Sequence, residues 1–257
     1  MEKIRLDYSH DGAVANIILD DGKGNVLDNI MMNEILESIA EIREDKGIKL
    51  IIFQGNGKHF SFGASVEEHT SEMAEMMIKT FHKLFVDLID LGIPTLSKIS
   101  GQCLGGGLEL ALFSNFMFAD KTAVLGQPEI VLGVFAPPAS IMLPLKIGNA
   151  RAEDLLISGR VIKAEEGKEM GLLKTIYDDQ NSMNEAVDQW ITKYILPRSA
   201  SSLKYAVKTA RTTFNYIMLN KLPVLESIYL NELMKTKDAN EGINAFIEKR
   251  DPIWQNC

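Results

Sequence analysis

The sequence predicts an α/β core followed by a helical C-terminal subdomain. Strand-like and helix-like apolar patterns alternate along residues 1–196, as expected where strands pack against helices. Pro197 interrupts this alternation, and residues 197–257 show helical spacing with almost no strand pattern. The chain has 257 residues, of which 46% are hydrophobic and 24% charged, so it can bury one substantial core.

The N-terminal elements follow from the spacing of apolar residues. Short segments predict strands at Ile4–Asp7 and Val14–Leu19, and a compact apolar run predicts another at Lys49–Phe53. Apolar residues three and four apart predict helices from Asp28 to about Glu44 and from about Thr70 to Leu91. Methionines and phenylalanines form the stripe of the second helix, which is typical of core packing.

Proline and glycine residues mark the boundaries of the later elements. Pro94 precedes a predicted strand at Thr95–Ile99. Short helices are predicted around Ser140–Ile147, at Arg151–Ser158 and at Ala164–Met170, and a glycine follows each of the last two. The tail beyond residue 197 has apolar faces that one core would not fully cover, which favours an interface; its members include Leu203, Met218, Leu222 and Ile228.

The composition and charge of the chain argue against some classes of binding partner. The formal net charge is −8 and the pI is near 5.1. No basic stripe is present, which argues against nucleic-acid binding. No apolar run approaches the ~20 residues of a membrane span, and the N-terminus lacks the apolar segment of a signal peptide. The only cysteines are Cys103 and Cys257, a pattern that argues against a structural disulfide. We therefore expect a cytoplasmic protein with no membrane partner.

Common catalytic and cofactor motifs are absent. The chain has no nucleophile elbow, no phosphate-binding Gly-Lys-Ser/Thr loop and no dinucleotide fingerprint after its first strand. The four histidines lack metal-ligand spacing and no Cys-x-x-Cys occurs, so we expect no metal and no bound cofactor. His59 lies near a candidate ligand loop, where a polar surface role is favoured over a catalytic one.

A glycine-rich segment followed by two acids is the most informative pattern. Three consecutive glycines, Gly105 to Gly107, run into a helix-like segment that carries Glu109, and Glu129 follows inside a Gly-Gln-Pro turn. Glycine lets a ligand approach the backbone, and a helix start offers unpaired N–H groups with partial positive charge. Such a site can stabilise negative charge on a carbonyl oxygen. The two acids could then divide proton transfer, one as base and one as acid.

A second loop, residues 57–65, follows a strand and is rich in small residues. It leads toward the long amphipathic helix predicted from about Thr70. Two loops at the ends of two strands could face each other across a crevice, and we expect this loop and the glycine turn to do so.

Three segments together resemble a known family. Lys-His-Phe-Ser-Phe-Gly-Ala-Ser (58–65), Gly-Gln-Cys-Leu-Gly-Gly-Gly-Leu-Glu-Leu-Ala (101–111) and Leu-Gly-Gln-Pro-Glu-Ile (125–130) are similar to the signature loops of the crotonase (enoyl-CoA hydratase/isomerase) superfamily. Segments 152–160 and 241–250 also match, so the resemblance covers essentially the whole chain. It implies a ββα spiral core with a helical C-terminal subdomain, 197–257, that assembles trimers, often paired into hexamers.

The resemblance implies a catalytic set. The substrate would be an acyl-CoA thioester, and its enolate oxygen would accept hydrogen bonds from the backbone N–H groups of Ala64 and Gly106. Glu109 and Glu129 match the two catalytic glutamates of the hydratases. We expect Glu109 to activate water and Glu129 to deliver the proton, although the sequence leaves this division open. No cofactor is implied beyond the CoA that the substrate carries.

The resemblance also implies CoA contacts. The adenine would lie against the backbone from Phe62 to Val66, and Lys23 is a candidate for the phosphates. Phe246 and Lys249 would reach CoA from the C-terminal helices. Lys23, Phe246 and Lys249 each have an alternative role as a surface or core residue. The predicted CoA-binding residues are Lys23, Phe62, Ala64, Ser65, Val66, Phe246 and Lys249.

Two departures from the family pattern bear on the substrate. Ser65 stands where many members have aspartate, so a role for that side chain is in doubt. Pro137 stands where ordinary hydratases have a glycine whose N–H helps to hold the attacking water, and proline has no N–H. Phe135 could add an apolar face suited to a six-membered ring. Segments 60–65 and 132–140 are most similar to members that hydrate a cyclic dienoyl-CoA.

Three other functions remain open from the sequence, the first of which is a general enoyl-CoA hydratase. An isomerase on the same fold would move protons without adding water, and the presence of both Glu109 and Glu129 counts against it. A non-catalytic scaffold that binds RNA or a protein is a rival of another class. The acidic pI and the intact acid pair count against that rival.

Overall fold

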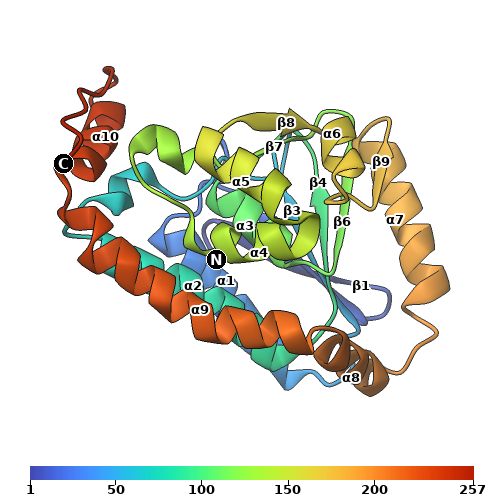
Figure 1. Ribbon diagram of the computed structural model, residues 1–257. Coiled ribbons are helices and arrows are strands. Elements are labelled where there is room, and N and C mark those ends of the chain that lie inside the picture. Colours follow the sequence, from blue (N-terminus) through green and yellow to red (C-terminus); the bar gives the residue numbers. More distant parts are fainter.

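The computed structural model describes residues 1–257, which form two β-sheets and their covering helices (Figure 1). The larger sheet has the strand order β1-β2-β3-β4-β6-β9, in which β1 is antiparallel to β2 and all other neighbours are parallel. Its strands are β1 (Ile4–Ser9), β2 (Val14–Leu19), β3 (Leu50–Gly55), β4 (Thr95–Ile99), β6 (Phe116–Asp120) and β9 (Thr175–Tyr177). The smaller sheet contains β5 (Gln102–Leu104), β7 (Val124–Gly126) and β8 (Val161–Lys163).

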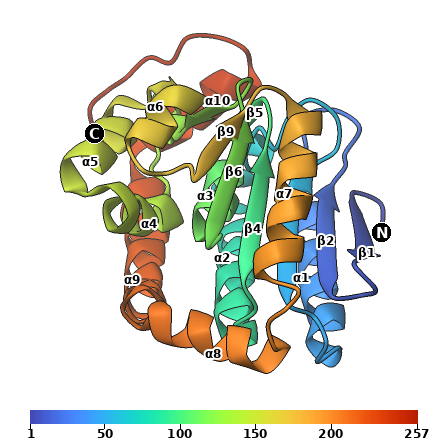
Figure 2. The same ribbon diagram turned by 90° about the vertical axis from the view of Figure 1, so that its right-hand side faces the viewer.

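Helices cover both faces of the larger sheet. The α-helices are α1 (Asn29–Glu44), α2 (Ala74–Leu91), α3 (Gly106–Phe113), α4 (Pro137–Ile147), α5 (Asn149–Ser158), α6 (Ala164–Glu169), α7 (Gln180–Tyr194), α8 (Ala200–Ala210), α9 (Thr212–Asn231) and α10 (Lys237–Ile247). Short 3₁₀ turns are η1 (Val66–His69), η2 (Pro128–Leu132) and η3 (Leu233–Lys235). Figure 2 shows α7 against one face of the sheet, while α1, α2 and α3 lie behind the strands. The alternation of strands and helices confirms the predicted α/β class.

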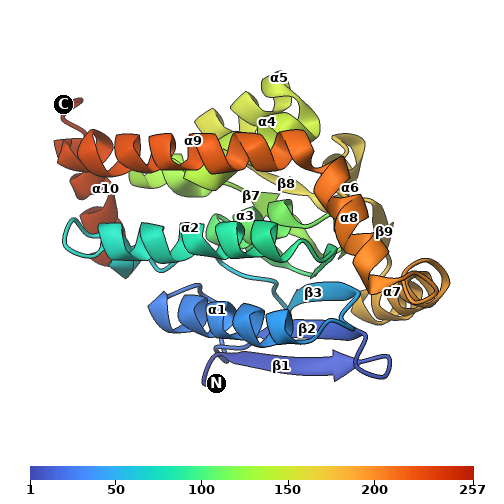
Figure 3. The same ribbon diagram turned by 90° about the horizontal axis from the view of Figure 1, so that it is seen from below.

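The C-terminal helices join the main core. Figure 3 shows α9 running alongside α2, and α9 also packs against α4. Its buried residues Met218, Leu222 and Tyr229 belong to the same apolar cluster as α1, α2 and α3. The tail therefore supplies part of the wall around the centre of the molecule, and a division at residue 197 stays a prediction.

Local signals explain where the helices begin and end. The Asp28 carboxylate caps α1 by accepting from the Met31 N–H at 3.0 Å. Gly92 ends α2 in the left-handed conformation, with φ 66°. The predicted start of this helix at Thr70 was wrong, because a 3₁₀ turn at 66–69 precedes it and α2 begins at Ala74. Helix α4 begins before the predicted Ser140, since Pro137 and Pro138 fit the first turn, where no N–H is needed.

Several elements were not predicted. Strands β5, β7, β8 and β9 have three residues each, too few for an alternating pattern to be recognised. Helix α7 also lay outside the predicted set. No helix of the protein combines the length and apolar character that crossing a membrane requires.

Candidate active site

The two loops singled out in the sequence run side by side. The Ser61 N–H donates to the Gln102 carbonyl at 3.0 Å, and the Leu104 N–H donates to the Ser61 carbonyl at 3.0 Å. Gly63 sits in the left-handed region (φ 109°), and a Cβ there would lie 3.0 Å from the Leu104 carbonyl. These contacts bring Ala64 next to the glycine turn, which confirms the expectation that the loops face each other.

Two backbone amides form the centre of the site. Gly106 is the first residue of α3, and a Cβ on it would lie 3.1 Å from the Ala64 nitrogen. Neither the Ala64 N–H nor the Gly106 N–H donates to another group of the protein. The pair is therefore free to donate to one ligand oxygen, and the start of α3 adds partial positive charge there.

The glycines on either side of Gly106 make room for the acid and for the opposite loop. Gly105 has φ 48°, and a Cβ there would lie 2.8 Å from the Glu129 Oε1. A Cβ on Gly107 would lie 2.6 Å from the Ser61 Cβ. Each of the three consecutive glycines thus avoids a different clash.

Glu109 lies in the first turn of α3 and is only 4% exposed. The Ala139 N–H of α4 donates to its Oε1 at 2.8 Å. Burial, followed by the neighbouring Glu129 carboxylate, raises the pKa of Glu109 well above its ordinary value, and the Ala139 hydrogen bond opposes that rise.

Glu129 lies in the 3₁₀ turn Pro128–Leu132, on the other side of Gly105. With its side-chain nitrogen facing Glu129, the buried Gln127 amide donates to both carboxylate oxygens at 2.9 Å. Burial raises the pKa of Glu129 to about 7. A carboxyl group in this position can exchange a proton near neutral pH.

Glu109 and Glu129 act as a coupled pair of acids. Because two buried carboxylates disfavour each other's ionised form, the pair holds one proton near neutral pH, which gives the site one base and one acid at once. Burial raises the pKa of both carboxyl groups. The division expected from the sequence, with Glu109 as base and Glu129 as acid, stays a prediction.

The coupled pair predicts a pH-dependent stability. The pKa of Glu129 in the fold is about 7, above its ordinary 4.5, so the stability gained by protonation is complete below pH 4.5 and lost as the pH rises through 7. Glu129→Gln cannot ionise and should be more stable than the parent at pH 8, by about 1.4 kcal/mol per unit of pKa difference. Urea unfolding at pH 5, 7 and 8 measures this gap, which should shrink toward pH 5. A gap that is constant across this range would contradict the prediction.

A cavity of about 490 Å³ joins these groups. Its walls come from both loops, from η2, from the start of α4 and from α9 and α10. Of the residues predicted from the sequence, the cavity brings together Phe62, Ala64, Ser65, Val66, Gly106, Glu109, Glu129, Phe135, Pro137 and Phe246. Catalytic, CoA-binding and substrate-pocket candidates thus share one space.

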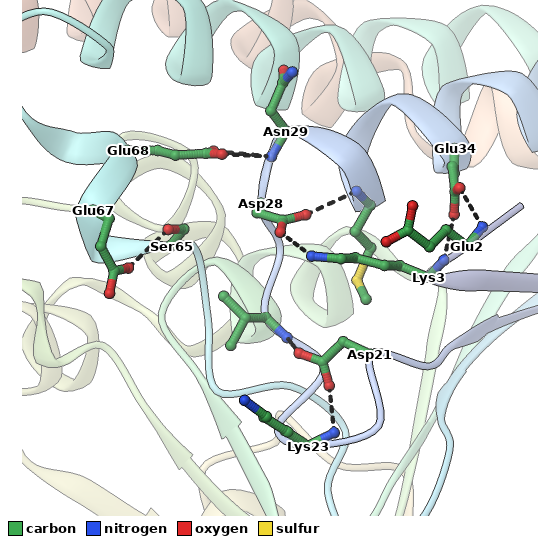
Figure 4. Close-up of polar contacts among 12 residues, drawn as sticks. Glu2, Lys3, Asp21, Lys23, Asp28, Asn29, Glu34, Ser65, Glu67 and Glu68 are labelled. Carbon is green, nitrogen blue, oxygen red and sulfur yellow. Dashed lines mark hydrogen bonds and ion pairs between the residues drawn. The ribbon is translucent and has the colours of Figure 1, made fainter.

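Lys23 and Lys249 do not line this cavity. Figure 4 shows Asp21 near Lys23; its carboxylate accepts from the Lys23 backbone N–H and the Val26 N–H, at 2.8 Å each. The Lys23 side chain is exposed and forms no ion pair, and Lys249 is exposed just beyond α10. Their proposed contacts with CoA would have to be made outside the cavity, and both stay predictions.

The residues that the 57–65 loop contributes to the cavity differ in exposure, since Ser65 is buried and Phe62 is exposed. The Ser65 hydroxyl donates to the Glu67 carboxylate at 3.0 Å (Figure 4). The ring of Phe62 is 47% exposed and packs edge-on against His59, with ring centroids 4.9 Å apart. His59 itself accepts from the Gln102 N–H at 3.1 Å, so it braces the two loops. Cys103 is buried in the core beneath the glycine turn, as expected of an apolar filler, and burial raises the pKa of its thiol.

Sequence reasoning missed several polar residues of the site, among them Gln127, His82 and Tyr229. Gln127 contacts Glu129 and was quoted only as part of a turn. His82 and Tyr229 line the cavity from α2 and α9. Both fall at ordinary helical spacing among apolar residues, and no local motif distinguishes them from core positions.

Comparison with known proteins decides the family. The family model for enoyl-CoA hydratase/isomerase matches residues 9–257. The chain belongs to the enoyl-CoA hydratase/isomerase family. This confirms the resemblance noted in the sequence, and the protein is an enzyme of that family.

Individual relatives span almost the whole chain. A cyclohexa-1,5-dienecarbonyl-CoA hydratase of Thauera aromatica is 42% identical over 253 residues, covering 98% of this chain and 97% of that protein. A probable enoyl-CoA hydratase of Mycobacterium bovis is 33% identical, covering 89% of this chain and 88% of that protein. A solved enoyl-CoA hydratase from Bacillus anthracis has a TM-score of 0.77 at 28% identity and covers 99% of this chain and 100% of its own. An enoyl-CoA hydratase from Mycobacterium avium subsp. paratuberculosis, 19% identical, has a TM-score of 0.86 and covers 99% of each chain. The likeness of this last structure shows the crotonase fold.

Proposed function

We propose that the protein hydrates cyclohexa-1,5-diene-1-carbonyl-CoA to 6-hydroxycyclohex-1-ene-1-carbonyl-CoA, a step of anaerobic benzoyl-CoA degradation. The observation that carries the proposal is the coupled pair Glu109 and Glu129 in one cavity with two free amides. The 42% identity to a hydratase named for this cyclic dienoyl-CoA supports the choice of substrate.

The geometry supports a 1,4-addition. The thioester oxygen accepts from the Ala64 and Gly106 N–H groups, which draw electron density from the conjugated ring. One glutamate takes a proton from water, and the oxygen bonds to the ring carbon beta to the thioester. The other glutamate gives its proton to the far end of the diene, and the remaining double bond then joins the ring carbon that bears the thioester to its neighbour on the side away from the new hydroxyl group. The net change is the addition of one water molecule, and the pair of Glu109 and Glu129 again holds one proton.

The wall beside the acids supports a cyclic substrate. The rings of Phe135 and Tyr229 lie edge to face with centroids 5.4 Å apart, and both line the cavity. Pro137 and Pro138 open α4 and stiffen this side. A rigid apolar wall suits a planar six-membered ring better than a flexible acyl chain.

A panel of thioesters tests the substrate. The purified protein is incubated with the cyclic dienoyl-CoA and with crotonyl-CoA, and the products are analysed by mass spectrometry. We expect the mass of one water to be added to the dienoyl-CoA and crotonyl-CoA to be a poor substrate. Efficient hydration of crotonyl-CoA without turnover of the cyclic ester would show that the protein is a general enoyl-CoA hydratase. A product of unchanged mass would show that it is an isomerase.

We further propose that the protein assembles as a trimer or a dimer of trimers. Met218 and Leu222, expected at an interface, are buried within the chain itself. The surface of α8 and α9 still exposes large apolar side chains, including Tyr216 at 69% and Val224 at 50%. Light scattering at micromolar concentration should give at least three times the chain's 28.6 kDa. A monomer mass would refute the assembly.

A further inference from the structure

Tyr229 is a buried tyrosine whose hydroxyl has no hydrogen-bond partner. The residue is 1% exposed and lies near the end of α9. Buried polar groups almost always find a partner, so an unpartnered hydroxyl beside a cavity calls for an explanation. Tyr229 lines the same cavity as Glu109 and Glu129.

The ring of Tyr229 is held in place. It packs edge to face against Phe135, at a centroid distance of 5.4 Å and an interplanar angle of 65°. Burial raises the pKa of the phenol, and the carboxylates of Glu129 and Glu109 raise it further. The hydroxyl therefore stays neutral, and it lies within the electrostatic reach of both acids.

The start of α4 has no free backbone donor. Pro137 and Pro138 have no N–H, and the next one, on Ala139, is used by Glu109 at 2.8 Å. A water molecule beside the acids would find no N–H donor on Pro137, Pro138 or Ala139. The Tyr229 hydroxyl is an unused polar group in the same cavity.

We propose that the Tyr229 hydroxyl is a catalytic residue that holds the water added to the substrate and then the product's new hydroxyl group. This inference rests on the proposed hydration. Of the two hydrogens of water, one passes to the glutamate base and the other remains in the product. The second hydrogen is donated to the Tyr229 oxygen, so that the water oxygen keeps a lone pair for the ring carbon. No proton leaves Tyr229 in this step.

Tyr229→Phe tests the assignment, with Tyr194→Phe as the control. Tyr194 lies on α7, which contributes no residue to the cavity, and is 47% exposed. Losing one hydrogen bond to the water should lower kcat about tenfold or more in Tyr229→Phe and leave KM within about twofold. The control should match the parent. The melting temperature of Tyr229→Phe should be unchanged or higher, since the hydroxyl has no partner in the protein.

The dissociation constants of two ligands distinguish a role of Tyr229 in binding the hydroxyl group from a purely structural role. Dissociation constants are measured for the hydroxylated product and for cyclohex-1-ene-1-carbonyl-CoA, which lacks the hydroxyl. Tyr229→Phe should weaken the first by about fivefold or more and leave the second unchanged. Equal weakening of both, or an unchanged kcat, would overturn the proposal.

Assays of the parent protein show whether the proposed substrate is wrong, independently of the role of Tyr229. If the parent hydrates only crotonyl-CoA, the proposed cyclic substrate is wrong, and the same comparison is made with 3-hydroxybutyryl-CoA against butyryl-CoA. A selective loss for the hydroxylated ester would still support Tyr229, and no selective loss would refute it.

Discussion

Replacing Glu109 or Glu129 by glutamine should lower the hydration rate by about 10²- to 10⁴-fold, the usual cost of removing a positioned acid or base. Glutamine keeps the size of the side chain and can still accept from the Ala139 N–H at position 109. Binding of the CoA ester should therefore survive in both variants. Single-turnover kinetics and a dissociation constant for a substrate analogue separate the two effects.

The coupling of Glu109 and Glu129 also predicts the rate of the double variant. Because neither acid can complete the proton transfer alone, the double variant should be about as slow as the slower single variant rather than slower by the product of both losses. Glu165→Gln, at an exposed position on α6, serves as the control and should keep the parental rate. Near-parental turnover in either active-site variant would make that glutamate a structural residue.

The candidate active site could be predicted from the sequence in large part because many of its determinants are local. The glycine run, Glu109 and Glu129 lie within one segment, and each glycine meets a specific contact that a Cβ would violate. The loop at 57–65 follows a strand whose neighbour leads to the glycine turn, so parallel pairing of β3 with β4 brings the two loops together. Local chemistry and sheet topology were enough to expect that the two loops face each other, and the family resemblance singled out the amides of Ala64 and Gly106.

The remaining wall could not be predicted because it depends on long-range packing. Tyr229 reaches the cavity only because α9 packs along α2 and α4, and both of those helices are distant from α9 in the sequence. The donor to Glu109 comes from Ala139, whose position depends on α4 starting at two prolines rather than at Ser140. The spacing of apolar residues along α9 does not distinguish a tyrosine in the core from one that lines a cavity.

Gly106→Ala should abolish most of the activity while preserving the fold. The added Cβ would lie 3.1 Å from the Ala64 nitrogen and 3.3 Å from the Ala64 Cβ, in the space between the two amides. It would hold the thioester oxygen away from at least one donor, and losing one donor of this kind costs about 10²- to 10³-fold in kcat. Gly106 has no positive φ, so alanine fits its backbone without strain.

A second glycine provides the control for the added methyl group. A Cβ on Gly47 would meet only the Asp45 side chain, neither residue lines the cavity, and Gly47 also has no positive φ. Gly47→Ala should therefore keep the parental kcat. Equal thermal stability of Gly106→Ala and the parent, together with the loss of kcat, would place the defect between the amides of Ala64 and Gly106. A fully active Gly106→Ala would show that the thioester oxygen does not bind there, because no ligand oxygen could reach both donors past that methyl group.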